Sequence, residues 1–347
     1  MIITGMYRPR ERAVRSNRRR LNAAKVPSRH GIADSSNLAW LSRANWNMIV
    51  VIRSYTADNL QRVLDLLLDC TRAGHVDMEL RSIELRLALA NPAFDRQRHT
   101  AMIEQDGALI AFGLLWQGRY LGLLVHPDSR GVCEHDLIEW AEARLVEDGI
   151  GLLIVLCRSD DDLLRTLLER RGYSVGNDEL RMTRSLGAPP PQPTLPGGFT
   201  LRTLRLPEEM DAWLALYAEA FGSRESALRK WRAFRADSDY DPTLDLIIVD
   251  SDDHIAAACT CSIAATELAA VHPREGRTEP VMVSSRYRGI GLGRAVVQAG
   301  LIALRDRGIE VASLTTEPDN SIAHRLYESL GYEVTYKALW YQRPLHD

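Results

Sequence analysis

Three short landmarks occur twice along this chain at almost the same separation, 158 or 159 residues. They are Arg130-Gly131 with Arg288-Gly289, Gly149-Ile150 with Gly308-Ile309, and Gly172-Tyr173 with Gly331-Tyr332. The period is far longer than the repeat of a solenoid, so stacked small repeats do not explain it. The pattern instead predicts two copies of one domain.

Composition marks the boundaries of the two copies. Residues 187–198 are rich in proline and glycine, which is typical of a stiff linker. We therefore expect one copy over residues 48–186 and a second over residues 199–347.

The first 47 residues differ from the rest in charge. Nine arginines and Lys25 are accompanied only by Glu11 and Asp34, and apolar residues show little periodicity. This composition predicts a disordered basic extension. An arm that contacts nucleic acid and a transit peptide are the alternatives; we favour the plain extension and expect no nucleic-acid partner.

The composition of the whole chain is that of an ordinary soluble protein. It is 46% hydrophobic with a net charge of −3, and no apolar run reaches the roughly 18 residues of a membrane helix. The five cysteines form no CxxC pair, and Cys259 and Cys261 alternate on an expected strand. We expect buried thiols, a cytoplasmic location, no membrane contact, no metal, and a monomer or homodimer.

Hydrophobic periodicity and turn residues predict a mixture of strands and helices. Strands are expected at 48–53, 100–104, 109–116, 120–125, 152–156, 199–202, 244–249, 255–261, 281–283, 310–316, 333–336 and 338–341. Helices are expected at 60–70, 78–90, 163–171, 208–221 and 227–235, after the turns at 126–135 and 286–294, and from Asn320 to Gly331.

The turn at 286–294 has the composition of a phosphate-binding loop. Gly289, Gly291 and Gly293 alternate between an apolar strand and a helix, so backbone N–H groups can approach a ligand closely. The first turn of the helix adds unpaired N–H groups and the positive end of its dipole. Arg288 and Arg294 can add charge. The spacing fits neither G-x-G-x-x-G nor a loop that ends in Gly-Lys-Ser/Thr.

Two motifs in this region resemble those of the GNAT acetyltransferase superfamily. Arg288, Gly291 and Gly293 fill the family's Arg-x-x-Gly-x-Gly pattern. The second signature, Asn-x-x-Ala-x-x-x-Tyr-x-x-x-Gly-Phe/Tyr, is filled by Asn320, Ala323, Tyr327, Gly331 and Tyr332. The tandem layout, with an eroded first copy and an intact second, resembles that of the mycothiol synthase group.

The resemblance implies an α/β fold with a mixed sheet in each copy and acetyl-CoA as co-substrate. It also implies the residues of the second copy that bind acetyl-CoA. They are Val281, Met282, Val283, Arg288, Gly289, Ile290, Gly291, Leu292, Gly293, Arg294, Asn320 and Ala323.

Acyl transfer to an amine needs a base for the amine and an acid for the departing thiolate. The resemblance puts the hydroxyl of Tyr327 near the thioester sulfur, which makes it the candidate acid. Glu279 is the candidate base, on the same side of its strand as Val281 and Val283, with a bulge expected at Pro280. Glu267 and His272 are alternatives.

The first copy has lost these features. Cys133 and His135 stand where the second copy has Gly291 and Gly293, and Glu134 would repel a pyrophosphate. Leu168 replaces Tyr327, and only the 160–162 region corresponds to Asn320. His126 and His135 could bind a metal, but we expect no such role. The first copy is therefore predicted to be a degenerate domain, kept for packing or to shape the acceptor site.

Together these features predict an acetyl-CoA-dependent N-acetyltransferase acting on a primary amine of a small molecule. The alternatives are an acetyltransferase for a protein amine and a regulator that binds CoA without turnover. The sequence does not identify the acceptor.

Overall fold

The computed structural model describes residues 51–53, 55–74, 85, 89, 94–116, 118–222, 224, 228, 231–232, 235, 240–263 and 274–345. The predictions for 1–47, for the helix at 78–90 and for most of the helix at 227–235 fall outside these residues. The same holds for Glu267 and His272.

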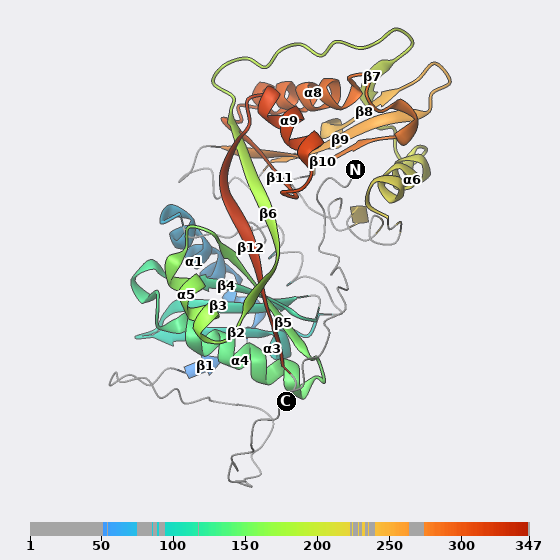
Figure 1. The fold of residues 1–347 in the computed structure, drawn as a ribbon. Helices are drawn as coiled ribbons and strands as arrows, with labels where there is room; N and C mark the ends of the chain where they lie inside the picture. The colour runs from blue at the N-terminus through green and yellow to red at the C-terminus, as the bar shows by residue number, and fades with distance from the viewer. Residues whose placement is uncertain are drawn as a thin grey trace.

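All the described strands belong to one mixed sheet of 12 strands. The strand order is β1-β2-β3-β4-β5-β12-β6-β11-β10-β9-β8-β7 (Figure 1). Counted inward from its edge, each half of the sheet has five strands in chain order and then the last strand of the other copy, as expected for two copies of one domain. The strands are β1 (Val51–Arg53), β2 (Thr100–Gln105), β3 (Ala108–Trp116), β4 (Tyr120–Val125), β5 (Leu152–Arg158), β6 (Ser174–Ser185), β7 (Thr200–Thr203), β8 (Asp245–Val249), β9 (Ile255–Ile263), β10 (Glu275–Val283), β11 (Val311–Thr316) and β12 (Glu333–Pro344).

The two copies exchange their last strands. We call residues 51–170 the first lobe and residues 200–329 the second lobe. Strand β6 leaves the first lobe and pairs with β11 of the second, while β12 leaves the second lobe and pairs with β5 of the first. The exchanged strands also pair with each other and run side by side between the lobes (Figure 1). Each lobe therefore completes its sheet with a strand from the other copy.

Helices cover both faces of each half of the sheet, and each face has its own apolar core. In the first lobe, α1 (Leu60–Arg72) packs on one face, and α4 (Cys133–Glu147) and α5 (Asp162–Arg170) pack on the other. In the second lobe, α6 (Met210–Phe221) covers one face, and α8 (Leu292–Asp306) and α9 (Ser321–Ser329) cover the other. A short helix, α3 (Arg96–His99), precedes β2.

Most predicted elements are present, but the centre of the sheet was not foreseen. The sequence did not predict β6, and β12 was expected as two strands. Instead it is one strand with a register shift between Val334 and Tyr336. Strand β10 begins at Glu275, six residues before the expected start. Residues 187–199 form no helix or strand.

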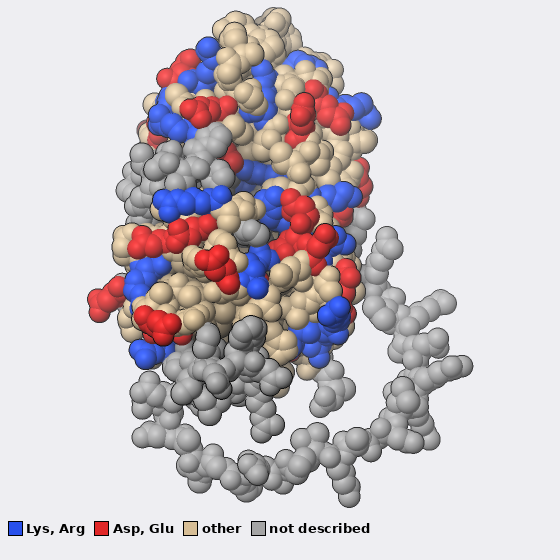
Figure 2. All heavy atoms as spheres, turned by 90° about the vertical axis from the view of Figure 1, so that its left-hand side faces the viewer, with Lys and Arg blue, Asp and Glu red and all other residues tan. Residues whose placement is uncertain are grey.

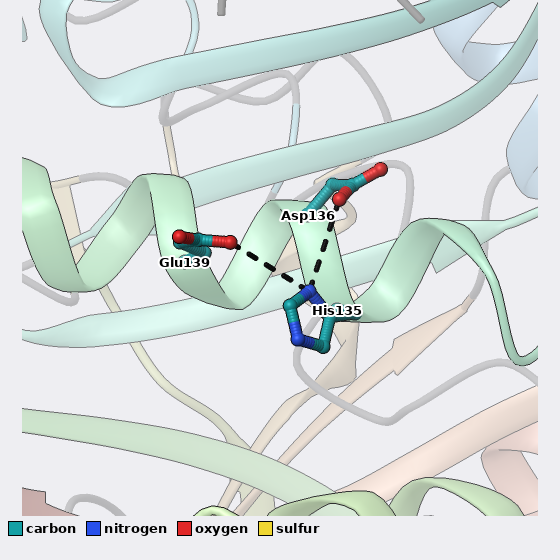
Figure 3. Close-up of side chains that lie close together, drawn as sticks. All are labelled: His135, Asp136 and Glu139. Carbon is teal, nitrogen blue, oxygen red and sulfur yellow. Dashed lines mark ion pairs between the residues drawn. The ribbon is translucent and has the colours of Figure 1, made fainter. Parts of the chain in front are cut away.

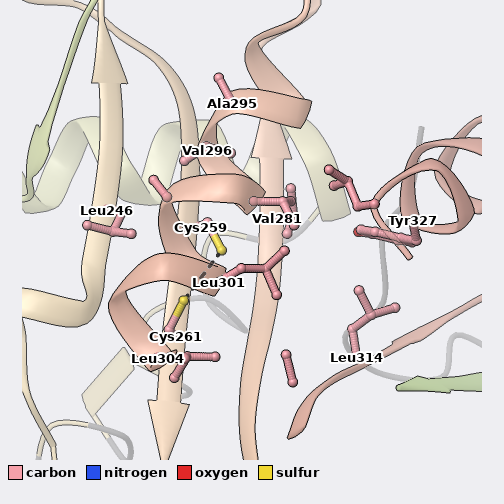
Figure 4. Close-up of a cluster of buried hydrophobic side chains, with 14 of the residues drawn as sticks. Leu246, Cys259, Cys261, Val281, Ala295, Val296, Leu301, Leu304, Leu314 and Tyr327 are labelled. Carbon is pink, nitrogen blue, oxygen red and sulfur yellow. Dashed lines mark hydrogen bonds between the residues drawn. The ribbon is translucent and has the colours of Figure 1, made fainter. Parts of the chain in front are cut away.

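A pair of buried thiols packs against α8 in the second lobe. Cys259 and Cys261 point to the same side of β9, as expected, and their sulfur atoms lie 3.7 Å apart (Figure 4). The helix comes close because residue 300 is glycine. A Cβ atom at Gly300 would lie 2.8 Å from the sulfur of Cys261 and 3.2 Å from that of Cys259.

We expect Gly300→Ala to lower the free energy of unfolding by about 1–2 kcal/mol, because overpacking against the sulfur atoms outweighs the gain in helix propensity. In a Cys261→Ala background the same substitution should be neutral or stabilising. Chemical denaturation of the four proteins of this double-mutant cycle measures the difference. An equal loss in both backgrounds would show that Cys261 does not set the packing distance.

Candidate active site

Strands β10 and β11 separate in the middle of the second lobe. They pair in parallel only from Glu275 to Arg277, opposite residues 311–313. Beyond this point the register of β10 with β9 shifts between Thr278 and Val281, and the Glu279–Pro280 peptide bond is cis. The bulge expected at Pro280 is therefore present. From Thr278 to Val283 the edge of β10 does not pair with β11, and we call this separation of the two strands the opening.

The loop after β10 has the backbone that a close approach requires. Gly289 and Gly291 have φ values of 83° and 92°, and a Cβ atom at either would meet nothing within 4 Å. Gly291 caps the N-terminus of α8. A Cβ atom at Gly293 would lie 3.3 Å from Val283, so this glycine lets the helix pack against the strand.

The backbone N–H groups of this loop are unused. In the part of the chain that the structure describes, no N–H group from residue 288 to residue 294 donates a hydrogen bond; the first to do so is that of Ala295, to the carbonyl of Gly291. A row of free N–H groups at the N-terminus of a 15-residue helix is a site for an anion.

The two arginines of the loop differ in their contacts. Arg288 is exposed and its Nε donates to the carbonyl of Val283 at 3.3 Å. Arg294 donates instead to Ser329 Oγ of α9 at 2.7 Å. Arg288 is therefore the better placed of the two to add charge beside the free N–H groups.

The start of the loop is held by acidic groups that the sequence did not reveal. Glu219 of α6 accepts a hydrogen bond from the backbone N–H of Ser285, and this bond lowers the pKa of Glu219. Tyr287 donates to Asp250 at the end of β8. These contacts bring together segments far apart in the sequence, which is why motif spacing could not predict them.

Tyr327 lies on α9 and is buried in the apolar core of the second lobe (Figure 4). Asn320 caps this helix by accepting from the N–H of Ala323 at 3.2 Å, as expected. The hydroxyl of Tyr327 is buried and has no hydrogen-bond partner among the described residues. Burial raises its pKa well above the ordinary value, and the charge of Glu279 adds to this. The phenol therefore keeps its proton at neutral pH.

Glu279 lies across the opening, bound on both oxygens. One accepts from the N–H and the Oγ1 of Thr315 at 2.9 and 2.8 Å, and the other pairs with Arg277 Nε at 2.6 Å. Burial alone would raise the pKa of Glu279. The charge of Arg277, the hydrogen bonds from Thr315 and the charge of Arg181 outweigh burial and lower it.

The predicted orientation of Glu279 was wrong. The hydroxyl groups of Thr278 and Tyr332 share a hydrogen bond of 2.6 Å. Thr278 therefore faces α8 and α9, as Val281 does. Thr315 points to the opposite face, because its neighbour Leu314 lies in the core beneath α8. Glu279 binds Thr315, so the bulge at Pro280 turns it away from the side of Val281.

The first lobe has the same loop with its anion position already filled. The carboxylate of Glu134 accepts from the N–H of Gly131 at 2.7 Å and from Arg130 at 2.6 Å. Arg130 also binds Asp161, which caps α5 as Asn320 caps α9. Glu134 therefore accepts the hydrogen bond that the N–H group of Gly131 could otherwise donate to a bound anion. This obstructs anion binding more than the charge repulsion expected from the sequence.

His135 and His126 of the first lobe lie beside carboxylates of neighbouring residues. His135 Nδ1 lies 3.8 Å from Asp136 and 3.7 Å from Glu139, all on α4 (Figure 3). Its Nε2 lies 3.0 Å from Arg171, a cation that would oppose a bound metal. His126 Nδ1 accepts from the N–H of Asp128.

The surface carries charges of both signs. Figure 2 shows Lys and Arg interspersed with Asp and Glu over the described part of one face, without the continuous basic stripe of a nucleic-acid site (Figure 2). Among the described residues, no helix is both long and apolar enough to cross a membrane.

Comparison with known proteins gives one family. The model of the acetyltransferase (GNAT) family matches residues 210–332. The chain is 32% identical over 257 residues to a mycothiol acetyltransferase of Salinispora arenicola, covering 71% of this chain and 81% of that protein. It is 31% identical over 291 residues to a mycothiol acetyltransferase of Geodermatophilus obscurus, covering 78% and 89%.

The fold agrees. A tandem GNAT protein from the clavulanic acid biosynthesis pathway superposes with a TM-score of 0.67, covering 86% of this chain and 99% of that one at 14% identity. The family match, the identity to these relatives and the tandem fold together show that the chain is an acetyltransferase of the GNAT family.

Proposed function

We propose that this chain transfers an acetyl group from acetyl-CoA to a primary amine of a small molecule, and that the second lobe does so. The observation that carries the proposal is the row of free N–H groups at residues 288–294, in the loop that follows the unpaired end of β10. Such a row suits the diphosphate of CoA.

The opening offers a path from that loop to Tyr327. Residues 281–283 of β10 pair with β9, but the edge of β10 that faces β11 has no ladder beyond Arg277. Backbone groups along this edge can pair with the amides of the pantetheine arm. Val281, Met282 and Val283 would line the arm, and the acyl group would then lie toward Glu279 and Tyr327.

Each candidate residue has a proton state that suits its role. Glu279, with its lowered pKa, is ionised at neutral pH and attracts a cationic amine; it binds the proton weakly and so can pass it to solvent. The amine nitrogen attacks the thioester carbonyl carbon, and the carbon–sulfur bond breaks. Tyr327 holds the proton that the departing sulfur needs, and its free hydroxyl favours turnover over mere CoA binding.

The name of the two relatives supports a small-molecule acceptor. Purified protein with acetyl-CoA should release free thiol with at least one amine from a panel of thiol-sugar amines, aminoglycosides, polyamines and amino acids. Release only with a protein amine would select the alternative acceptor class. CoA binding without release from any amine would indicate a regulator.

Gly291→Glu should weaken CoA binding by about a hundredfold or more, because a side chain at this φ is strained and its charge would oppose the diphosphate. Gly291→Ala is the matched control. It introduces the strain of about 1–2 kcal/mol without the charge, and it should cost about tenfold. Isothermal titration calorimetry with CoA measures both, and unchanged affinity in the glutamate variant would refute the loop assignment.

Tyr327→Phe should lower kcat by about a hundredfold with little change in CoA affinity, because it removes the acid and leaves the loop intact. The variant should be as stable as the parent or more so, since it removes a buried hydroxyl that has no described partner. Tyr332→Phe is the control. It loses a bond to Thr278, so it should cost about 1 kcal/mol of stability and keep kcat. Full activity in Tyr327→Phe would exclude Tyr327 as the acid.

A further inference from the structure

Strand β6 brings a buried arginine of the first copy into the second lobe. Arg181 lies opposite Thr315 in the pairing of β6 with β11, and its side chain is only 5% exposed. Cross-strand partners point to the same face of a sheet. Arg181 therefore shares its face with Thr315, whose side chain binds Glu279.

The contacts of Arg181 lie at the closed end of the opening. Its Nη2 reaches over β11 to the carboxylate of Glu275, the first residue of β10. Ser313 of β11 donates to the same carboxylate oxygen at 2.7 Å. Glu275 and Ser313 belong to the short stretch in which β10 and β11 still pair. Arg181 thus links three strands where β10 and β11 begin to diverge.

The charge of Arg181 is only partly matched by its surroundings. Glu275 is 30% exposed, so water screens part of its charge. The second terminal nitrogen of Arg181, Nη1, is buried without a hydrogen-bond partner among the described residues. Leaving such a donor unpaired costs about 1–3 kcal/mol, which the fold alone does not require.

The first lobe shows that the fold tolerates an apolar group at this position. Trp340 of β12 lies opposite Leu156 of β5, and both positions are 159 residues from Arg181 and Thr315, respectively. Trp340 packs in an apolar cluster with Ile154, Leu156 and Ala338. The polar group on this face is therefore a property of the second lobe and not of the architecture.

We propose that Arg181 is a positioning residue for Glu279, so that the first copy supplies part of the site of the second through the exchanged strand. Arg181 fixes the closed end of the opening and keeps a positive charge on the face that holds the carboxylate. This inference rests on the proposed role of Glu279 in proton transfer.

The sign of the effect follows from the groups around Glu279. Among the described residues, those that interact electrostatically with its carboxylate are Arg277 on its own strand, Arg181 on β6, Cys259 on β9 and Tyr327 on α9. The two arginines and the hydrogen bonds from Thr315 favour the ionised form. Without Arg181 the pKa of Glu279 should rise, and activity should be lost at a higher pH as the solution is acidified.

The test compares Arg181→Met with Arg184→Met in the full-length protein. Arg184 lies on the same strand but points to the other face and donates to the carbonyl of Leu330. Carbon-13 NMR of labelled glutamate carboxyls, assigned with Glu279→Gln, follows the titration of Glu279 without any substrate. We expect a higher pKa in Arg181→Met and no change in Arg184→Met. If Arg181→Met does not fold, Arg181→Gln should raise the pKa and Arg181→Lys should keep it low.

The pH profile of kcat/KM gives the second measurement. In Arg181→Met the acid limb of this profile should move to higher pH together with the NMR titration of Glu279. At a fixed pH on that limb, each pH unit of displacement should lower kcat/KM about tenfold. No shift in Arg181→Met, or the same shift in both variants, would overturn the inference. If the NMR titration shifts but the protein acetylates no amine, the proposed function is wrong and the effect of Arg181 on Glu279 still holds.

Discussion

The backbone ladder between β6 and β12 is the interaction on which the rest of this structure depends. It joins two lobes that would otherwise each end in an unpaired strand edge. Side chains reinforce the exchange in both directions. Tyr341 and Arg343 of β12 bind Glu169 and Glu142 on helices of the first lobe. Arg184 of β6 binds the end of α9 in the second. Each lobe therefore depends on a strand of the other copy to cover the inner edge of its sheet.

The corresponding loops of the two lobes differ in whether their backbone N–H groups and their arginine are bound by carboxylates of the chain. In the second, residues 288–294 leave their N–H groups free, and Leu292 and Asn320 offer no charge to Arg288. In the first, Glu134 and Asp161 stand at the corresponding places and both bind Arg130. A carboxylate from the chain itself thus fills the position that the other lobe keeps open. Glu134 and Asp161 thus form an internal ion-pair cluster with Arg130 in the first lobe.

The sequence predicted the features that depend on short stretches of chain. The glycine-rich turn, the capped helix at Asn320, the bulge at Pro280 and the duplication all arise from local spacing or from direct repetition. The centre of the sheet could not be predicted in this way. Residues 174–185 include Gly176, Asn177, Asp178 and Arg181, and they lack the alternation of a half-buried strand. Their pairing comes from β11 and β12, more than 120 residues away in the sequence.

In the candidate site, too, the sequence predicted the residues that belong to local motifs and missed those that come from distant elements. Tyr327 and the loop residues follow from motifs, whereas Glu219 and Arg181 reach the second lobe from distant elements. The face to which Glu279 points depends on how many extra residues the bulge inserts into β10. The pattern of apolar and polar residues in a strand does not give that number. A register error of one residue moves a side chain to the other face, which is what separates the predicted and observed positions of Glu279.

The exchange also has a consequence for biosynthesis. Residues 338–344, which pair with β5, are synthesised at least 180 residues after their partners (338 − 158 = 180). Chains generally fold from the N-terminus during synthesis, but here the edge of β5 stays uncovered until β12 has been synthesised. The first lobe therefore cannot complete its sheet before the second copy has been synthesised.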